Sequence, residues 1–232
     1  AGGAYSYDLS GTLCWSSHPA GINFVNIVAA EDLDGNGDIE ILLSAGRPCY
    51  PYGAVVLLNL SDGTLIWKYD VEPVSYWWNV VADHFLEKTG KQFVVLAHGY
   101  PPDEKNGYIT FFDFSAEGVP FQKWRYDFHQ YTCFPTLLQS DIEGDGKKEI
   151  AVQTHSRMWL LDSETGVLKD FLSWDVSPAN IRSYGLTVFV DLDKDGRDDF
   201  LCIADFAQHH EVLMNRNGKL IPAWHYGWDE SV

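Results

Sequence analysis

An acidic loop of nine residues occurs three times in this chain, and its residue types are those that bind a hard metal ion. Each copy places oxygen-bearing side chains at positions 1, 3, 5 and 9, and a glycine at position 6, where the backbone must turn sharply. Ca²⁺ takes roughly six to eight oxygen ligands from a flexible cage, and a backbone carbonyl at position 7 adds to the four side chains. The predicted ligands are Asp32, Asp34, Asn36, Asp38 and Glu40 in the first loop, Asp141, Glu143, Asp145, Lys147 and Glu149 in the second, and Asp191, Asp193, Asp195, Arg197 and Asp199 in the third.

The spacing therefore predicts three Ca²⁺ ions with a structural role. Each ion would tie together the two strands that flank its loop. Position 3 of the second loop is Glu143, where the other loops have Asp, and its longer arm is expected to weaken that cage. Sites of this kind in extracellular modules have dissociation constants of about 10⁻⁴ to 10⁻³ M, so cytosolic calcium would leave them mostly empty. We therefore expect an extracellular, cell-surface or periplasmic location.

A fourth copy of the loop begins at Asp83, but it lacks the ligands. His84, Phe85, Leu86 and Gln92 stand where oxygen ligands belong. We predict no metal ion in this loop.

The composition argues against several classes of partner. The chain has 232 residues and a formal net charge of −17, which disfavours nucleic acid or an anionic membrane as a partner. Thirteen of the 33 acidic residues lie in the three loops, so three bound Ca²⁺ would bring the charge from −17 to −11 and relieve much self-repulsion. No apolar run approaches the roughly 20 residues of a membrane-spanning helix. The length suits a single all-β domain.

The four cysteines have no metal-binding spacing. Cys202 lies inside an apolar strand pattern and is expected to be a small buried hydrophobe. Cys49 and Cys133 lie in predicted loops and could pair. The cysteines therefore do not decide between an oxidising and a reducing compartment. The sequence has no initiator Met and no signal peptide, and we expect the chain to be processed or cut from a longer one.

The loops also define a repeat. They begin at Asp32, Asp83, Asp141 and Asp191, at spacings of 51, 58 and 50 residues. Each loop follows one short apolar run and is followed by three more, which are rich in β-branched and aromatic residues and separated by turn residues such as Asp-Gly and Asn-Gly. Four strands in a unit of about 50 residues predict the blade of a β-propeller.

We therefore expect an all-β chain that forms about four and a half blades of a β-propeller, with no helix of ordinary length. The predicted blades cover about 24–72, 77–127, 133–175 and 184–228, after a half-blade at 5–16. Such a number of blades does not close a ring. We expect the chain to be part of a larger propeller of about seven blades, or an open fragment.

The order of an apolar strand, the D-x-D-x-(D/N)-G-x-x-(D/E) loop and a second apolar strand resembles the FG-GAP / VCBS repeat of integrin-type propellers. The resemblance covers nearly the whole chain and implies that the loop between the first two strands of a blade binds Ca²⁺. It implies no single activity, because such propellers serve adhesion, glycan binding and polysaccharide cleavage. The strand ending at Trp67 is also similar to the Trp-ending strands of quinoprotein propellers, but a Trp there packs between blades and implies no cofactor.

Propeller topology separates the remaining loops by face. The turns between first and second strands share the acidic face with the turns between third and fourth strands, and the other loops share the opposite face. Those other loops are rich in aromatic residues, His and Arg, which bind sugar rings, hydroxyls and carboxylates. The opposite face is therefore the predicted ligand-binding surface, and its candidate residues are Arg47, Tyr76, Trp77, Trp78, His129, Tyr131, His155 and Arg182.

Other interpretations of this surface remain open. Loop histidines are often only solvated, and one of the adjacent Trp77 and Trp78 can face into the blade instead. A cluster of histidines could also hold a transition metal.

The sequence contains no motif of a known catalytic centre, such as G-x-S-x-G, H-E-x-x-H or a Gly-rich phosphate loop, and we assign no catalytic residue. The favoured function is a non-catalytic, calcium-stabilised module that binds a glycan or another surface protein. One alternative is a polysaccharide lyase, in which Arg47 or Arg182 holds a uronate carboxylate and His129 or His155 abstracts the adjacent proton. Another is a structural scaffold segment of a larger surface protein.

Overall fold

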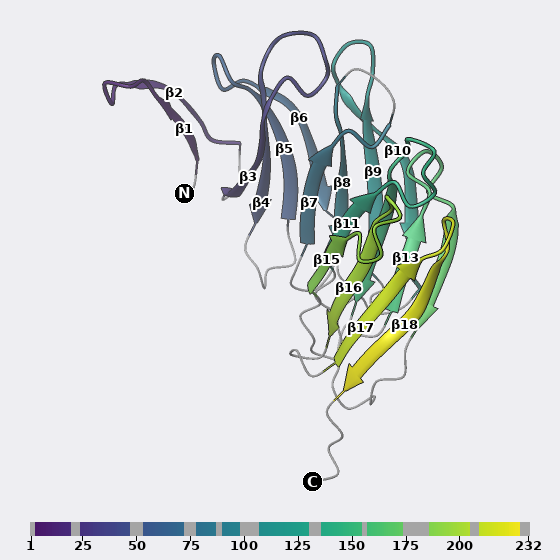
Figure 1. Cartoon of the computed structure of the whole chain (residues 1–232). Coiled ribbons are helices and arrows are strands. Elements are labelled where there is room, and N and C mark those ends of the chain that lie inside the picture. The colour runs from purple at the N-terminus through teal and green to yellow at the C-terminus, as the bar shows by residue number, and fades with distance from the viewer. Residues whose placement is uncertain are drawn as a thin grey trace. The chain divides into compact units, whose positions relative to one another are not determined.

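The computed structural model describes the chain as short strands joined by turns (Figure 1). The ranges described are 3–19, 24–46, 53–71, 78–86, 90–97, 107–129, 136–154, 157–173, 186–204 and 209–227. These ranges contain eighteen β-strands and no helix, so the all-β class predicted from the repeat is confirmed. It follows that no helix within them is able to cross a membrane.

The described strands form one two-stranded sheet and four four-stranded sheets, all of them antiparallel. Within each four-stranded sheet, the strands pair in the order in which they occur along the chain. A sequential four-stranded antiparallel sheet is the blade of a β-propeller. The fold is thus a β-propeller segment with four blades and a half-blade among the described residues, as the repeat predicted.

Two compact units divide the chain. The first comprises Ala1–His84 and Lys88–His129, and the second comprises Phe85–Glu87 and Gln130–Val232. The first unit begins with the half-blade, β1 (Ala4–Tyr7) and β2 (Leu13–Ser17). Its first blade consists of β3 (Phe24–Glu31), β4 (Glu40–Gly46), β5 (Gly53–Asn59) and β6 (Leu65–Val71). Its second blade consists of β7 (Trp78–Asp83), β8 (Gln92–Ala97), β9 (Tyr108–Phe114) and β10 (Pro120–Asp127).

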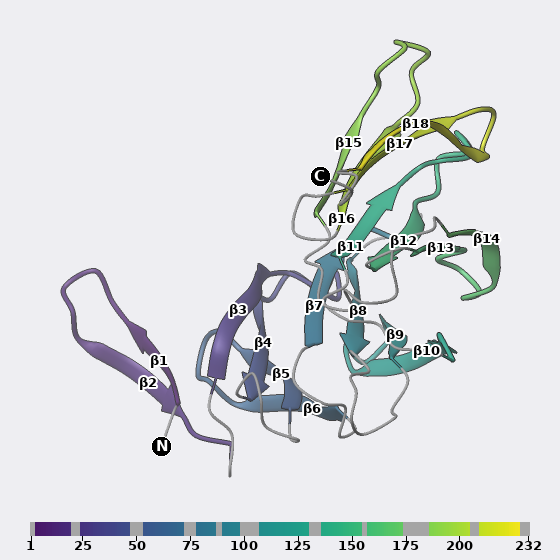
Figure 2. The same cartoon turned by 90° about the horizontal axis from the view of Figure 1, so that it is seen from below.

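The second unit holds the third and fourth blades. The third consists of β11 (Thr136–Ser140), β12 (Glu149–Thr154), β13 (Arg157–Leu161) and β14 (Leu168–Ser173). The fourth consists of β15 (Leu186–Val190), β16 (Asp199–Ala204), β17 (His209–Asn215) and β18 (Leu220–Gly227). Within each unit the first strands of the two blades are neighbours, β3 with β7 and β11 with β15, and the strands can be followed in Figure 2. Contact between first strands is expected for blades arranged around an axis.

Inner strands such as β5 and β8 are apolar along nearly their whole length because both of their faces are covered. β5 is buried from Ala54 to Leu58, and β8 is buried throughout. The outer strand β14, in contrast, consists only of exposed and half-buried residues. A strand covered on both faces reads as a continuous apolar run, so the sequence identifies these inner strands clearly.

In the first unit, the core between the two blades is aromatic. Phe93 and Phe112 of the second blade stack with ring centroids 5.0 Å apart and an interplanar angle of 11°. Trp67, on the fourth strand of the first blade, meets these two rings edge-on at 5.7 and 5.1 Å. Trp67 therefore packs between blades, as expected from its place in the repeat.

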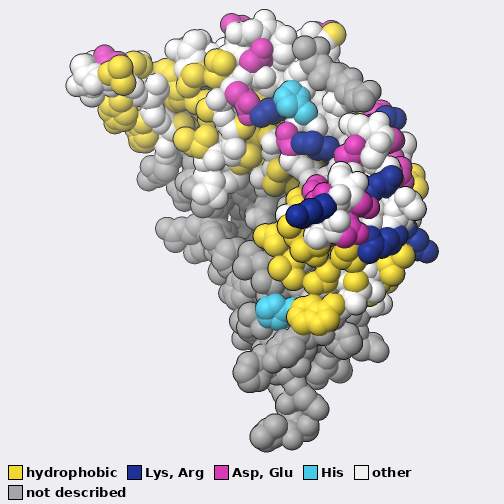
Figure 3. All heavy atoms as spheres, viewed as in Figure 1, with side chains coloured by type: hydrophobic (Ala, Val, Ile, Leu, Met, Phe, Trp, Pro, Cys, Tyr) yellow, Lys and Arg dark blue, Asp and Glu magenta, His cyan; other side chains and the backbone are white. Residues whose placement is uncertain are grey.

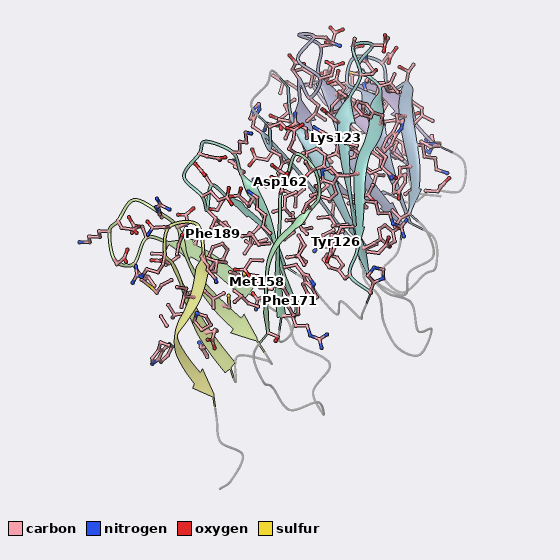
Figure 4. All side chains as sticks on the ribbon, turned by 90° about the vertical axis from the view of Figure 1, so that its right-hand side faces the viewer. Lys123, Tyr126, Met158, Asp162, Phe171 and Phe189 are labelled. Carbon is pink, nitrogen blue, oxygen red and sulfur yellow. The ribbon has the colours of Figure 1, made fainter. Side chains whose placement is uncertain are left out.

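In the second unit, the core lies between the third and fourth blades. Met158 of β13 packs with Phe200 and Cys202 of β16, and Phe189 of β15 covers this cluster (Figure 4). Cys202 is 1% exposed, so the prediction of a buried small hydrophobe is confirmed. Burial raises the pKa of its thiol to about 12, which keeps the thiol protonated at neutral pH.

Phe93→Ala should destabilise the first unit strongly. The ring is fully buried and stacks on Phe112, so its removal leaves a cavity that costs about 3–5 kcal/mol. Phe121 lies on β10 of the same blade but is 46% exposed, so Phe121→Ala should cost less than about 1 kcal/mol. Urea denaturation followed by tryptophan fluorescence measures both variants. Equal losses would mean that the aromatic cluster is not the core of this unit.

Candidate metal sites

The three acidic loops join the first and second strands of their blades. They connect β3 to β4, β11 to β12 and β15 to β16. The residue at position 9 of each loop is also the first residue of the second strand, so strand pairing fixes its place. These three residues are Glu40, Glu149 and Asp199.

The side chains at positions 1 and 5 hold the turn of each loop. The carboxylate at position 1 accepts a hydrogen bond from the N–H of the glycine at position 6, at 2.9, 2.9 and 3.0 Å in the three loops. That glycine has a φ of +97°, +91° or +88°, in the left-handed region that favours glycine. The side chain at position 5 accepts a hydrogen bond from the backbone N–H at position 7, which belongs to Asp38, Lys147 or Arg197.

The buried carboxylate at position 9 of each loop forms a hydrogen bond to the start of the same loop. One of its oxygens accepts a hydrogen bond from the N–H at position 2, at 2.9 Å in all three loops. Glu40 and Glu149 are 2% exposed, and Asp199 is 0% exposed. A buried carboxylate stays ionised only where hydrogen bonds or a cation stabilise its charge. Whether a loop can bind a metal ion therefore depends on whether a cationic side chain already lies beside its carboxylates. The three loops differ in this respect.

In the first loop, three carboxylates converge without a cation. Oxygens of Asp32, Asp34 and Glu40 lie within 4.8 Å of one another. Burial raises the pKa of Glu40, and the neighbouring Asp34 and Asp32 raise it further, although a backbone hydrogen bond opposes them. The nearby Lys91 pairs instead with Glu31, at 2.7 Å. Within the described ranges, no Lys or Arg side chain reaches the three converging carboxylates. This oxygen set fits a hard divalent cation such as Ca²⁺.

In the second loop, a lysine of the same blade lies inside the cage. Lys169 Nζ, from β14, lies 2.8 Å from Glu143 Oε2 at position 3 and 2.8 Å from Glu149 Oε1 at position 9. Lys169 Nζ also lies 3.6 Å from Oδ2 of Asp162, the residue that follows β13. Asp162 is labelled in Figure 4. Burial lowers the pKa of Lys169, but hydrogen bonds to Glu143 and Glu149 raise it to a value above the ordinary one. The lysine is therefore an ammonium ion at neutral pH.

In the third loop, an exposed arginine neutralises one carboxylate. Oxygens of Asp191, Asp193 and Asp195 lie within 4.8 Å of one another. Arg216, from the turn between β17 and β18, donates a hydrogen bond to Asp193 and thereby lowers the pKa of that carboxyl. The arginine side chain is 48% exposed, so water screens this ion pair and weakens it. The oxygen set fits a hard cation once the arginine turns away.

The turn between the third and fourth strands of the next blade lies against the loop. In the first unit, Gly118 of the second blade is so close to Asp34 that a Cβ atom on Gly118 would lie 2.0 Å from Asp34 Oδ2. In the second unit, the equivalent Gly218 of the fourth blade lies against Glu143. Asn215, in the same turn, is fully buried and donates from Nδ2 to the carbonyl at position 2 of the second loop, at 2.8 Å. Within each unit, these two kinds of turn therefore share one face, as propeller topology predicted.

The fourth copy of the loop, after Asp83, buries apolar side chains. Phe85 and Leu86 are 1% and 9% exposed, and Gln92 is buried at the start of β8. His84 is exposed, and its Nδ1 lies 3.0 Å from a backbone carbonyl oxygen of the same loop. Beyond Asp83 itself, the described residues at the ligand positions are thus apolar or amide side chains: Phe85 stands at position 3 and Gln92 begins the second strand.

The predicted ligand-binding surface lies mostly outside the described residues. The chain is described at His129, which is exposed with a φ of 54°, and at the backbone of Trp78, which begins β7. The surface, and the lyase alternative that uses its residues, therefore stay predictions. The other residues concerned, together with the two loop cysteines, fall in undescribed ranges: Arg47, Tyr76, Trp77, Tyr131, His155, Arg182, Cys49 and Cys133.

Sequence reasoning missed Lys169, Arg216 and Asn215, which all contact an acidic loop. None of the three belongs to a loop motif, and the one available signal is that a charged residue stands at position 169, where the other two blades with an acidic loop have Ile66 and Ala223. Such contacts also alter the surface. In Figure 3, Lys and Arg side chains lie among Asp and Glu side chains on the right-hand part of the described surface, beside hydrophobic areas.

The fold and the repeat together define a β-propeller built from four-stranded blades. No family model matches the sequence, and no curated protein matches it in a sequence comparison. Solved structures are similar in fold: a protein from Lactobacillus plantarum with a TM-score of 0.51 and 12% identity, and the V. cholerae biofilm matrix protein Bap1 with a TM-score of 0.52 and 10% identity. The Dos1 propeller aligns with a TM-score of 0.41 and 10% identity.

The alignments extend over almost the whole of this chain but not over the whole of the similar structures. They cover 98% of this chain in both of the first two cases, and 63% of the L. plantarum protein and 60% of Bap1. For the Dos1 propeller, they cover 99% of this chain and 65% of that chain. The chain thus spans less than two thirds of the length of each structure, and identities of this size show the fold alone.

Gly118→Ala should disturb the first acidic loop from the second blade. Gly118 and Gly11 have φ values of +74° and +84°, so alanine costs about 1–2 kcal/mol of backbone strain at either position. At Gly118 the new Cβ would also meet Asp34, whereas at Gly11 nothing lies within 4 Å. Gly118→Ala should therefore lower the Tm by roughly 2–4 °C more than Gly11→Ala, because Asp34 must turn away. Thermal melts in EGTA measure the difference, and equal losses would contradict the contact.

Proposed function

We propose that this protein is a calcium-stabilised β-propeller module that works outside the cytoplasm and binds a ligand there. The observation that carries the calcium proposal is the first acidic loop, where three carboxylates converge within 4.8 Å and Glu40 is 2% exposed. Like charges at this spacing repel one another, and burial removes the water that would screen them. A divalent cation bound among Asp32, Asp34 and Glu40 would remove both penalties.

The third loop supports the same proposal. Asp191, Asp193 and Asp195 converge in the same way, and Arg216 competes for them only as an exposed ion pair. An ion in either loop would link the first two strands of its blade. In the first loop it would also order Asp34, which lies against the Gly118 turn of the second blade, so the ion would stabilise packing between blades.

The extracytoplasmic location follows from the expected affinity. Loops of this type in extracellular modules bind Ca²⁺ with dissociation constants of about 10⁻⁴ to 10⁻³ M, which suits a calcium-rich compartment. We assign the chain to the FG-GAP / VCBS type of propeller on the pattern of its loops. Bap1, which is similar in fold, is named as a biofilm matrix protein, and a matrix is a setting of the kind proposed here.

Asp34→Asn tests the calcium proposal, because it removes one charge from the cage and keeps the size of the side chain. With about 5 mM Ca²⁺ and a dissociation constant of about 10⁻⁴ to 10⁻³ M, one site adds about 1–2 kcal/mol of stability. The variant should lose that gain together with one bound ion, so its Tm in calcium should lie roughly 2–6 °C below that of the wild type. In EGTA the two proteins should melt together, or the variant slightly higher, because the acids only repel one another there.

Asp70→Asn is the matched control for this test. Asp70 lies on β6 of the same blade, has a side chain that is 75% exposed and pairs with Lys68. Its substitution should change neither the number of bound ions, measured by equilibrium dialysis, nor the response of the Tm to calcium. If wild type and Asp34→Asn bind equal numbers of ions and melt together in calcium, the first loop is only a turn and the proposal is wrong.

The ligand that we propose is a glycan, bound by the face opposite the acidic loops. The support is chemical: the loops predicted for that face supply aromatic side chains such as Trp77 and Trp78, together with Arg182 and His129. Aromatic faces stack on sugar rings, and Arg binds carboxylates through two parallel hydrogen bonds. Another surface protein is the competing type of ligand.

Retention of the calcium-loaded protein on immobilised acidic and neutral polysaccharides tests the glycan proposal. Trp77→Ala or Trp78→Ala should weaken retention by about tenfold, which corresponds to about 1.4 kcal/mol. Trp224→Ala removes a tryptophan that is 53% exposed on β18, and it should leave retention unchanged. Release of unsaturated uronate ends would identify a lyase instead. Absence of retention on every polysaccharide would overturn the glycan proposal in favour of a protein partner or a scaffold.

A further inference from the structure

Lys169 stands at a position of the repeat that is apolar in the other two blades with an acidic loop. The turn between the third and fourth strands contains a glycine with positive φ in every blade. These equivalent glycines are Gly63, Gly118, Gly166 and Gly218. Lys169 lies where the register between the third and fourth strands shifts, and the residues at that shift in the other blades are Ile66, Lys123 and Ala223. Among the three blades with an acidic loop, a charge at this position therefore occurs only in the third.

Two acidic residues around Lys169 also depart from the repeat. Position 3 of the acidic loop is Glu143 here and Asp in the other two acidic loops. Asp162, whose carbonyl accepts the N–H of the turn glycine, stands where the first blade has Asn59. The three departures occur in one blade and meet in space, because Lys169 Nζ lies 2.8 Å from Glu143 Oε2 and 3.6 Å from Asp162 Oδ2. A longer acid at position 3 is the change that a lysine partner requires.

The ammonium group also satisfies the buried carboxylate of this loop. Glu149 Oε2 accepts the N–H of Ile142 at 2.9 Å, and Glu149 Oε1 accepts a hydrogen bond from Lys169 at 2.8 Å. The Glu149 side chain is 2% exposed and that of Lys169 is 22% exposed. Removal of the lysine from this place would leave a buried carboxylate without its cation, which is strongly destabilising.

A calcium ion and the lysine cannot occupy this cage together. An ion bound to Glu143 and Glu149 would need the same oxygens and would lie within a few ångströms of the ammonium group, where like charges repel strongly. The third loop differs, since Arg216 pairs with Asp193 alone and has a side chain that is 48% exposed. An ion can displace that arginine into water at little cost.

We propose that Lys169 takes the place of the metal ion in the second acidic loop, so that this loop closes without calcium and the three loops bind two Ca²⁺ rather than three. The count of two ions rests on the calcium binding proposed above, whereas the role of the lysine does not. The third blade would then keep its loop closed at calcium concentrations that empty the first and third loops.

Calcium stoichiometry tests the first half of this inference. Equilibrium dialysis with Ca²⁺ should give two ions for the wild type, one for Asp34→Asn and two for Glu143→Gln, because Glu143 binds the lysine rather than a metal. Three ions for the wild type, or one fewer for Glu143→Gln than for the wild type, would overturn the inference. Glu143 is 41% exposed in its side chain, so its amide variant can be accommodated in the fold.

Thermal melting in EGTA tests the second half without any metal. Lys169→Met should lower the Tm by roughly 6–10 °C, because it leaves the buried Glu149 without a cation. Lys68→Met is the matched control: Lys68 is also on a fourth strand, but its partner Asp70 has a side chain that is 75% exposed, so the Tm should fall by less than roughly 2 °C. Equal losses would show that Lys169 is an ordinary surface lysine.

The two measurements separate this inference from the proposed function. If the wild type binds no calcium, the calcium proposal fails, and the comparison of Lys169→Met with Lys68→Met still decides the role of the lysine. If Lys169→Met does not fold even at low temperature while Lys68→Met does, the lysine is required for closure of the loop, as proposed.

Discussion

The buried carboxylate at the ninth position of the acidic loop is the constraint on which the described structure depends. In all three loops it begins the second strand, accepts the N–H of the second loop residue and is at most 2% exposed. This arrangement stabilises the hairpin only if the negative charge is compensated. The free-energy cost of burying an uncompensated carboxylate is far larger than the stabilisation from one hydrogen bond. Each blade that keeps the carboxylate must therefore stabilise its charge with hydrogen bonds, with a cationic side chain or with an ion from solvent.

The blades meet this requirement in different ways on the same backbone. The third blade has Lys169 inside the cage, and the fourth has Arg216 at its exposed edge. The first has no cation on its three converging carboxylates among the described residues, which makes it the strongest candidate for a metal. Among its described residues, the second blade has no such carboxylate cage and buries Phe85 and Leu86 instead. In our proposal, one side chain outside the loop separates a metal site from a closed ion pair.

The state of each loop is also linked to packing between blades. The Gly118 turn lies against Asp34 in the first unit, and the turn that contains Asn215 lies against the second loop in the second unit. A substitution in an acidic loop is therefore expected to alter the packing of the next blade as well as the hairpin that contains the loop.

The sequence by itself determined the strands, the turns and the loops, because these depend on local patterns: apolar runs, glycines with positive φ and the spacing of oxygen ligands. It also determined that Cys202 is buried and that Trp67 packs between blades. Only the tertiary structure decided which side chains lie against each loop. Lys169, Arg216 and Asn215 lie 20, 23 and 73 residues along the chain from the loop residues that they contact. Strand pairing and blade packing bring them there, so the charge balance of a buried site depends on what folds against it.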